Sequence, residues 1–540
     1  MPEAHLILGP LLRRVVGAQA TVWVEVSQPV IVRVRAGAAY GEASSFSAFG
    51  RHYALVVVDG LTPGATTPYQ VWLGDRQVWP QPDTSGPPSV IRTRGGTDEP
   101  VRLVFGSCRE ATQRTTGRGL GPDALDSYAR RLSNSPEDWP DLLVLLGDQV
   151  YADETSPKVR GWLRERRRKG YAPDDQVMTY EEYTALYLES WRDPDIRWLL
   201  STVPSVMIFD DHEIIDDWNS SASWRADIEQ QQWWAERITN GIASYWVYQH
   251  LGNLTPDEIA ADPVWSAVRA ADDATAILSE FAARADRDTG SYRFSYYVDL
   301  AGTRLVMLDN RAGRVVEPGR RSMLPDQDWQ WFAELAAGTP EHLVVGASLP
   351  WLLPPAVHHM ENWNERLAES RRPVVRRLSE RLRRALDLEH WAAFRASFDR
   401  LGSILRALGS RPAPPASISV LSGDVHHSYV ARANLGPGVT APVHQLTCSP
   451  LHNEAPRFLH PMLSIGWRRP LGTAARAVAR TAGIPRPSVR WRRLAGPYFG
   501  NSIATLTHHG RQADVLIEGT TPDGALIAVA ETPLTAPPTG

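Results

Sequence analysis

Six apolar runs after residue 100 constrain the fold more than any other feature of the sequence. They are "VRLVFGSC", "DLLVLLGDQVY", "PSVMIFDDHE", "TRLVMLDNR", "HLVVGASLPW" and "SISVLSGDVHH", and they alternate with long stretches of helical character. This alternation is typical of an α/β domain built in layers. Five of the six runs end in polar or metal-binding side chains. Because functional groups gather at the carboxyl edge of such sheets, the pattern predicts a functional site there.

The first 94 residues have a different pattern. In "TVWVEV" and "VIVRVR" valine occupies every second position or alternates with arginine, which is the period of a strand. "DGLTPGATTP" then places Gly and Pro between two strand-like runs. Short strands without helical periodicity predict a small β-sandwich of the fibronectin III type over residues 1–94. "RTRGGTDEP" then reads as a linker, and residues 101–540 as a second, α/β domain.

Three helical insertions are expected in the second domain, at about residues 155–200, 219–290 and 356–412. In the last of these, six apolar residues recur at near-helical spacing, which predicts a packed helical face. They are Leu378, Leu382, Leu386, Phe394, Phe398 and Leu401.

Composition excludes several classes of protein. A net charge of −4 over 540 residues gives no general attraction to nucleic acid, so no stable nucleic-acid partner is expected. Two cysteines, Cys108 and Cys448, cannot form a disulfide framework. The sequence contains neither a recognisable signal peptide nor an apolar run long enough for a bilayer. These features predict a cytoplasmic protein that is not transmembrane.

The residues that end the apolar runs are suited to a site for two metal ions. "GDQVY" provides Asp148 and Tyr151 three residues apart, "FDDHE" provides Asp211 and His212, and "GDVHH" provides Asp424, His426 and His427. A bridging carboxylate can hold two ions, while imidazole, thiolate and phenolate adjust their affinity and charge. Each motif alone is weak evidence, but the ordered set predicts a dinuclear centre.

These motifs resemble the alkaline phosphatase D (PhoD-like) branch of the metallophosphoesterases, which is related to the purple acid phosphatases. The similar elements are "FGSCRE", "LLGDQVYAD", "FDDHEIIDDW", "MLDNR" and "LSGDVHHS", in the order of the family. The resemblance implies a layered metallophosphoesterase sandwich. It also implies that Asp148 bridges two ions and that Tyr151, Cys108 and His426 bind a ferric ion. Asp211 and Asp424 would bind a second ion, which the family associates with calcium.

The chain departs from purple acid phosphatases around the second ion. Ser348 stands where those enzymes have a histidine ligand, "DDHE" replaces "GNHE", and "GDVH" replaces "GHxH". The second site is therefore richer in oxygen than in nitrogen. Oxygen ligands favour calcium, magnesium or manganese over zinc.

Three further residues are predicted to act on the substrate. His212 is the candidate for donating a proton to the leaving oxygen. Arg311 and Arg109 follow strand ends and could hold a phosphate through two hydrogen bonds each, or else pair with the carboxylates of the site. We expect four other histidines to be structural because they lie in helical insertions: His250, His358, His359 and His390.

The predicted activity is hydrolysis of a phosphate ester at the two metals. The substrate is expected to be a small phosphate ester, with an anionic polymer or a lipid diester as further possibilities, and the motifs do not separate monoesters from diesters. The alternative is a catalytically weak, metal-containing binding protein of the same fold. Residues 457–493 contain nine arginines and no acidic residue, which indicates either a solvated or docking face or a patch that attracts anionic substrate or membrane.

Overall fold

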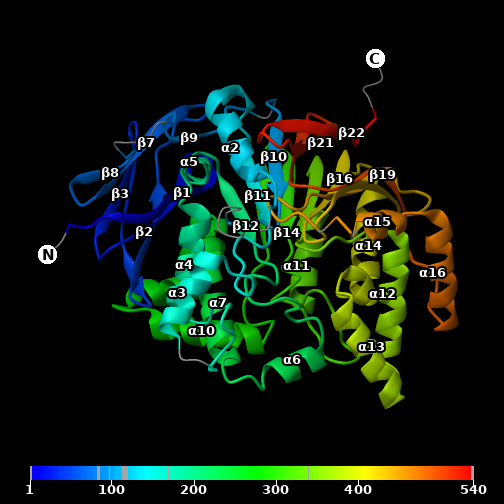
Figure 1. Ribbon diagram of the computed structural model, residues 1–540. Helices are drawn as coiled ribbons and strands as arrows, with labels where there is room; N and C mark the ends of the chain where they lie inside the picture. The colour runs from blue at the N-terminus through cyan, green and yellow to red at the C-terminus, as the bar shows by residue number, and fades with distance from the viewer. Residues whose placement is uncertain are drawn as a thin grey trace.

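The N-terminal part of the chain forms two antiparallel sheets (Figure 1). The computed structural model describes residues 3–81, 86–96, 98–111, 119–167, 170–338, 340–455, 457–458 and 460–536. One sheet has the order β1 (Leu6–Val16), β2 (Gln19–Val26), β6 (Arg51–Val58) and β5 (Phe46–Ala48). The other has β4 (Ala39–Ser44), β3 (Ile31–Ala36), β7 (Thr66–Leu73) and β8 (Arg76–Trp79), with β9 (Val90–Arg92) paired to β7.

Two larger sheets form the centre of the molecule. The first has the order β12 (Ser205–Ile208), β11 (Leu142–Leu146), β10 (Val101–Gly106), β20 (Ser502–His509), β21 (Gln512–Thr520) and β22 (Leu526–Pro533). The second has β13 (Tyr296–Leu300), β14 (Thr303–Met307), β15 (His342–Gly346), β16 (Ser417–Ser422), β18 (Val443–Thr447), β17 (Ser428–Asn434) and β19 (Arg490–Tyr498). The six predicted apolar runs are β10, β11, β12, β14, β15 and β16, so the α/β prediction is confirmed.

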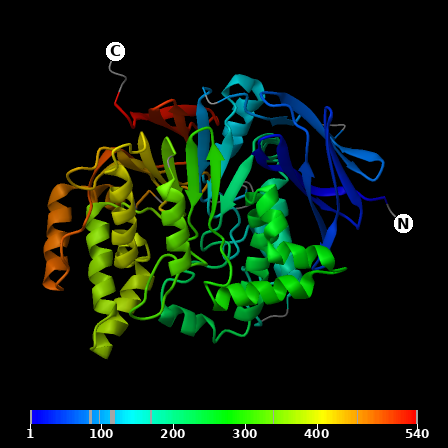
Figure 2. The same cartoon turned by 180° about the vertical axis from the view of Figure 1, so that it is seen from behind.

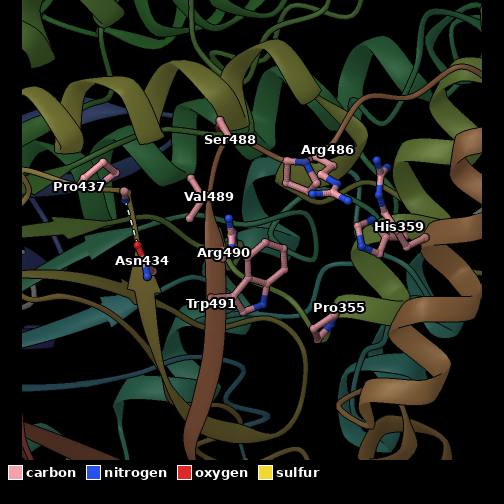
Figure 3. Close-up of a pocket in the computed structure, with 12 residues that line it drawn as sticks. Pro355, His359, Asn434, Pro437, Arg486, Ser488, Val489, Arg490 and Trp491 are labelled. Carbon is pink, nitrogen blue, oxygen red and sulfur yellow. Dashed lines mark hydrogen bonds between the residues drawn. The ribbon is translucent and has the colours of Figure 1, made fainter.

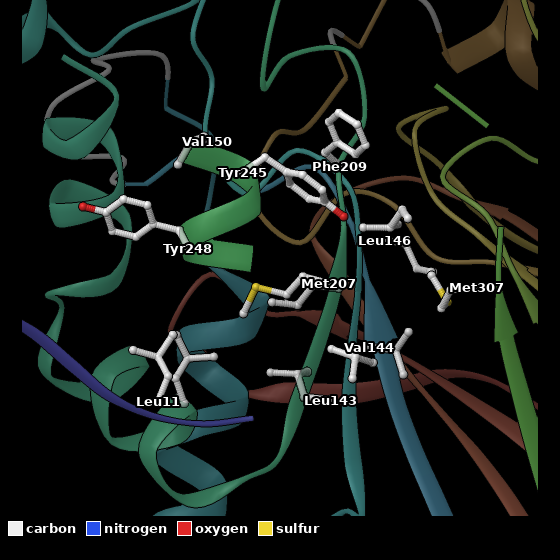
Figure 4. Close-up of a cluster of buried hydrophobic side chains, with 14 of the residues drawn as sticks. Leu11, Leu143, Val144, Leu146, Val150, Met207, Phe209, Tyr245, Tyr248 and Met307 are labelled. Carbon is white, nitrogen blue, oxygen red and sulfur yellow. The ribbon is translucent and has the colours of Figure 1, made fainter. Parts of the chain in front are cut away.

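The two central sheets pack face to face. Alternate side chains of a strand point to opposite faces, and those of β14 and β15 fall into two different apolar clusters. Met307 and Val344 belong to the apolar cluster that contains the β10–β12 side chains, whereas Val306 and Val345 pack with the helices on the outer side. Leu146 of β11 and Met307 of β14 lie close together in Figure 4, and both approach the backbone of Gly346. The sheets therefore form the two inner layers of a sandwich.

Helices flank these sheets (Figures 1 and 2). The first two insertions form α3 (Pro157–Arg166), α4 (Tyr180–Trp191), α5 (Pro194–Thr202), α6 (Ala222–Ile228), α7 (Trp234–Tyr245), a π-helical turn (Trp246–His250), a 3₁₀ turn (Leu251–Asn253), α8 (Pro256–Ala261), α9 (Pro263–Ala270) and α10 (Thr275–Arg287). The third forms α12 (Pro355–Ala368), α13 (Pro373–Ala385), a 3₁₀ turn (Trp391–Ala393) and α14 (Arg395–Gly409). The remaining helical elements are α2 (Ala124–Asn134), a 3₁₀ turn (Pro136–Asp138), α11 (Asp326–Ala337), α15 (His460–Ile465) and α16 (Arg469–Thr481). Among the described helices, none has both the length and the hydropathy that a membrane span requires.

The predicted packed face of the third insertion is wrong at its first half. Leu378 and Leu386 are 58% and 51% exposed, whereas Phe398 and Leu401 are buried. The stretch is not one helix: α13 ends at Ala385, and Asp387 adopts a left-handed conformation before α14 begins. Two separate helices present different faces, so a periodicity counted across the break has no structural meaning.

The N-terminal sandwich is attached to the rest of the protein through buried contacts. The β2 side chains are buried on both faces, with Val22 and Val24 inside the sandwich and Trp23 in the apolar cluster shared with β10–β12. Arg13 of β1 donates hydrogen bonds to the carbonyl oxygens of Ser205 in β12 (3.0 Å) and of Tyr248 in the second insertion (2.9 Å). The sandwich keeps its own apolar cluster and also contributes side chains such as Trp23 and Tyr53 to the core of the α/β part.

Glu25 of β2 lies at this contact between the sandwich and the α/β part and predicts a pH dependence of stability. It is fully buried, accepts a hydrogen bond from the Tyr248 hydroxyl (3.0 Å), and burial raises its pKa from 4.5 to about 7. A carboxyl group whose pKa is higher in the folded state stabilises the fold at low pH, and this contribution is lost as the pH rises from 4.5 to about 7. The full loss is about 3 kcal/mol.

We therefore expect Glu25→Gln to remove part of the fall in melting temperature between pH 5 and pH 8, measured by calorimetry. The amide does not ionise, so the variant should gain stability relative to the parent as the pH rises. Glu3→Gln, at an exposed position of the same sandwich, is the control. Parallel pH profiles for the parent and Glu25→Gln would contradict the assignment.

Candidate metal centre

The carboxyl ends of strands from both central sheets meet at one place. Cys108 follows β10, Asp148 follows β11 and Asp211 follows β12, all in the first sheet, while Asp424 follows β16 of the second. The backbone N–H of Asp424 donates to the Ser107 hydroxyl (3.1 Å), so the two strand ends touch directly. The predicted gathering of these residues at one edge is what the topology produces.

The close approach of strand ends requires glycine at two positions, Gly423 between the two sheets and Gly147 within the first sheet. A Cβ at Gly423 would lie 1.9 Å from the Ser107 hydroxyl oxygen, and a Cβ at Gly147 would lie 2.7 Å from the Asp210 Cβ. Gly147 also has φ +107°, which side chains rarely adopt. The "GD" pairs in the motifs thus combine a glycine that lets two strand ends approach with a carboxylate that follows it.

Four carboxylates converge at this point. One oxygen from each of Asp148, Asp210, Asp211 and Asp424 lies within 4.8 Å of the others, and His212 joins Asp148 and Asp211 in an overlapping group. Burial, together with the neighbouring carboxylates, raises the pKa of Asp148 and Asp210. Asp148 Oδ1 and Asp210 Oδ2 are buried without a hydrogen-bond partner among the described residues. Carboxylates in such proximity, two of them with a buried unpaired oxygen, fit a bound cation.

Cys108 and Tyr151 lie beside this carboxylate group. The Cys108 thiol is 3.4 Å from Asp148 Oδ2, and it accepts a hydrogen bond from the Ser449 hydroxyl (3.3 Å). The Tyr151 hydroxyl accepts one from the Asn453 amide (3.1 Å). Burial raises the pKa of both Cys108 and Tyr151 well above the usual values, and the charge of Asp148 raises them further. Both groups are therefore protonated unless a cation is bound.

His426 lies outside the group of converging carboxylates. Its backbone N–H donates to the Asp424 carbonyl oxygen (2.8 Å) within the loop after β16, and its side chain is half-buried. It is not part of the carboxylate group that includes Asp424. The structure therefore brings Asp148, Asp211 and Asp424 together, with Cys108 and Tyr151 beside them and His426 in the adjoining loop.

The backbone at four predicted ligands is strained. Cys108 (φ +55°), Asp148 (+52°), Asp424 (+66°) and His426 (+48°) are four of the nine non-glycine residues with left-handed φ in the described part of the chain. Each such residue costs of order 1–3 kcal/mol, and residues of this kind cluster at functional sites. The strain falls where the side chains must turn toward a common point.

Arg311 and Arg109 form ion pairs in this structure. Arg311 is fully buried, and its guanidinium pairs with Asp210 and with Glu389 (2.5 Å). Arg109 pairs with Asp123 (2.8 Å) and donates to the Ser190 carbonyl oxygen (3.0 Å). These contacts correspond to the salt-bridge alternative, and contact of either arginine with phosphate stays a prediction.

His212 is held by a carboxylate that is not part of the converging group. Its Nδ1 lies 2.9 Å from Asp153 Oδ1, and its ring is 4.8 Å from the Tyr151 ring. Burial alone would lower the pKa of His212, but Asp153, with a smaller contribution from Asp148, raises it well above the usual value. The contact with Asp153 therefore favours the protonated form of His212.

His390, which the sequence pattern assigned to structure, belongs to the site. Its Nε2 is 3.1 Å from Asp424 Oδ2, and its Nδ1 is 2.9 Å from Glu361 Oε1. The 3₁₀ turn that follows it and α12, which carries Glu361, come from the third insertion. The one signal in the sequence is local: "DLEHW" places Asp387 and Glu389 beside His390, and this acidic context resembles that of His212.

Comparison with known proteins agrees with this geometry. The family model of PhoD-like phosphatases matches residues 121–458, more than half of the chain, and a domain of unknown function, DUF7800, matches residues 3–91. The chain therefore belongs to the PhoD-like phosphatase family. No curated protein sequence is matched.

A solved structure of PhoD has a similar fold. Its TM-score is 0.58 at 13% identity, over 97% of this chain and 92% of that chain. A maltogenic amylase from S. marinus (TM-score 0.16, 8% identity, 97% of this chain and 80% of that one) and the type III pullulan hydrolase from Thermococcus kodakarensis (0.14, 10%, 96% and 94%) have no meaningful structural similarity.

Proposed function

We propose that the protein hydrolyses phosphate esters at a dinuclear metal centre. The observation that carries the proposal is the largely buried group of Asp148, Asp210, Asp211 and Asp424, in which Asp148 and Asp210 each have one oxygen without a hydrogen-bond partner among the described residues. Four carboxylates confined in this way require positive charge. Arg311, His212 and His390 do not balance them, because these three also pair with Glu389, Asp153 and Glu361, respectively. Membership of the PhoD-like phosphatase family supports a phosphatase.

The donor set supports two different ions. Cys108, Tyr151 and His426 would hold the first together with Asp148, which is the bridging ligand in the proposal, and Asp211 and Asp424 would hold the second. When bound, two such ions lower the pKa of a water molecule and neutralise charge on the phosphoryl oxygens. Thiolate and phenolate favour ferric iron at the first position, and carboxylates favour calcium, magnesium or manganese at the second.

The chain's own residues would protonate the leaving group and hold the carboxylates of the site in position. Protonated His212, fixed by Asp153, is placed beside Asp148 and Asp211 and can donate a proton to the leaving ester oxygen. Arg311 and His390 contact Asp210 and Asp424 and would hold these carboxylates in position. We assign Arg311 this positioning role because its guanidinium is enclosed by carboxylates.

The activity is tested with a chromogenic phosphate monoester and a chromogenic diester, each with and without a chelator. We expect turnover of at least one ester, its loss with chelator, and its recovery when metal is restored. Asp148→Asn should lose activity, whereas Asp174→Asn, at an exposed position, should retain it. Stoichiometric metal without turnover of either ester would instead indicate the catalytically weak binding protein.

The role of His212 is tested by separating turnover from metal binding. We expect His212→Ala to lower kcat by roughly 10²–10⁴, the usual scale for a proton donor, with metal content nearly unchanged. His509→Gln, at an exposed position, is the control. Loss of metal in step with activity would make His212 a ligand, as its proximity to Asp148 and Asp211 would allow.

Iron at the first position predicts a coloured protein. Cys108 and Tyr151 are both protonated without a cation, and only a strongly charged ion would hold both as anions. Concentrated protein purified in air should contain one iron per chain and absorb visible light. Tyr151→Phe should change or abolish the band, while Cys448→Ser should leave it unchanged. Active, colourless protein that contains zinc and no iron would overturn this assignment but not the hydrolase proposal.

A further inference from the structure

A second cavity, of about 900 Å³, lies outside the proposed metal centre. It is formed by the first turns of α12, by α16, by the loop after β17, and by the segment that leads into β19 (Figure 3). None of the residues proposed as metal ligands lines it. Its lining residues are Pro355, His359, Asn434, Gly436, Pro437, Arg476, Arg486, Pro487, Ser488, Val489, Arg490 and Trp491.

The cavity is strongly basic. Three arginines line it, no acidic residue does, and the surrounding segment from residue 457 to residue 493 contains no acidic residue. The side chains of Arg486 and Arg490 make no ion pair or hydrogen bond with any described residue, while Arg476 is fixed by hydrogen bonds to the carbonyl oxygens of Ile484 (3.2 Å) and Pro485 (3.0 Å). Arg486 and Arg490 are exposed, so their charges are hydrated and open to an anion that enters the cavity.

One acidic residue contacts the lining and is already engaged. The Asp399 carboxylate accepts a hydrogen bond from the Ser488 hydroxyl (2.6 Å) and pairs with Arg395 (3.4 Å). It therefore does not neutralise Arg486 or Arg490.

The remaining walls are suited to an apolar group. Trp491 is fixed because its Nε1–H donates to the Leu353 carbonyl oxygen (2.8 Å), and its ring stands around the same space as Pro355, His359 and Arg486 (Figure 3). His359 is only 8% exposed and has no hydrogen-bond partner among the described residues. Its imidazole can therefore donate a hydrogen bond into the cavity.

We propose that this cavity is a second anion-binding site for an organic phosphate, meaning a phosphoryl anion that carries an aromatic or other apolar group. Arg476, Arg486 and Arg490 would bind the oxygens, since guanidinium groups match phosphoryl oxygens in geometry and charge. Trp491 and Pro355 would contact the apolar part. The volume is in the range of small-molecule sites and exceeds what a phosphate ion alone would fill. Binding here does not depend on the metals.

The probe is phenylphosphonate, whose carbon–phosphorus bond is not an ester and is not cleaved by ester hydrolysis. Its binding is measured by titration calorimetry on the metal-containing protein. Arg486→Gln/Arg490→Gln removes two lining charges, and Arg492→Gln/Arg493→Gln removes two exposed charges of the same segment that do not line the cavity. We expect the first pair to weaken one binding event by at least about ten-fold. The second pair should keep that event.

Asp148→Asn should also keep this event, which separates the cavity from the metal centre and the present inference from the proposed function. Phenylphosphonate should bind the cavity more tightly than inorganic phosphate because of the ring contact with Trp491. The affinity should fall with ionic strength. Equal binding by the two arginine pairs, or loss of all binding in Asp148→Asn, would overturn the inference. Melting temperatures of both pairs close to the parent's would establish that the loss is not due to unfolding.

Discussion

The rest of the structure depends on the confinement of several carboxylates in one buried place. Asp148, Asp210, Asp211 and Asp424 repel one another, and burial makes each negative charge expensive. The protein supplies positive charge through Arg311, which pairs with Asp210 and is braced by the Glu389–Arg314 ion pair (2.9 Å), and through His390, which contacts Asp424. A bound cation would provide the positive charge that is still needed to neutralise the carboxylates. Affinity for metal thus follows from a charge that the fold leaves uncompensated.

Two sheets are needed to produce this arrangement. Strands of one sheet carry Cys108, Asp148 and Asp211, a strand of the other carries Asp424, and the contact between Ser107 and Asp424 fixes how closely they meet. The strained φ angles persist because the flanking strands over-determine the loop conformations. Rigid strands therefore hold side chains in positions that a loop alone would not maintain.

The sequence predicted the parts of the site that are local to strands. A buried run followed by Gly-Asp identifies both the strand and its terminal carboxylate, so the sequence alone places Asp148 and Asp424 at strand ends. His390 was missed because its partner Glu361 is on another helix, and no periodicity links the two. For the same reason the sequence does not decide whether Arg311 binds phosphate or pairs with carboxylates. Its carboxylate partners come from three separate segments. The face predicted across Leu378 and Leu386 failed because spacing does not reveal where a helix stops.

The pairing of β10 with β20 has a consequence for how the protein is made. Val101 lies opposite His508, so a strand near the start of the α/β part is completed by one that leaves the ribosome much later. Until then β10 has an open edge, and long-range pairing of this kind is slow. The strand ends that carry Cys108 and Asp148 are therefore translated well before their sheet can close. Ion uptake would then be a late event in biogenesis, and nascent chains would depend on protection of that edge.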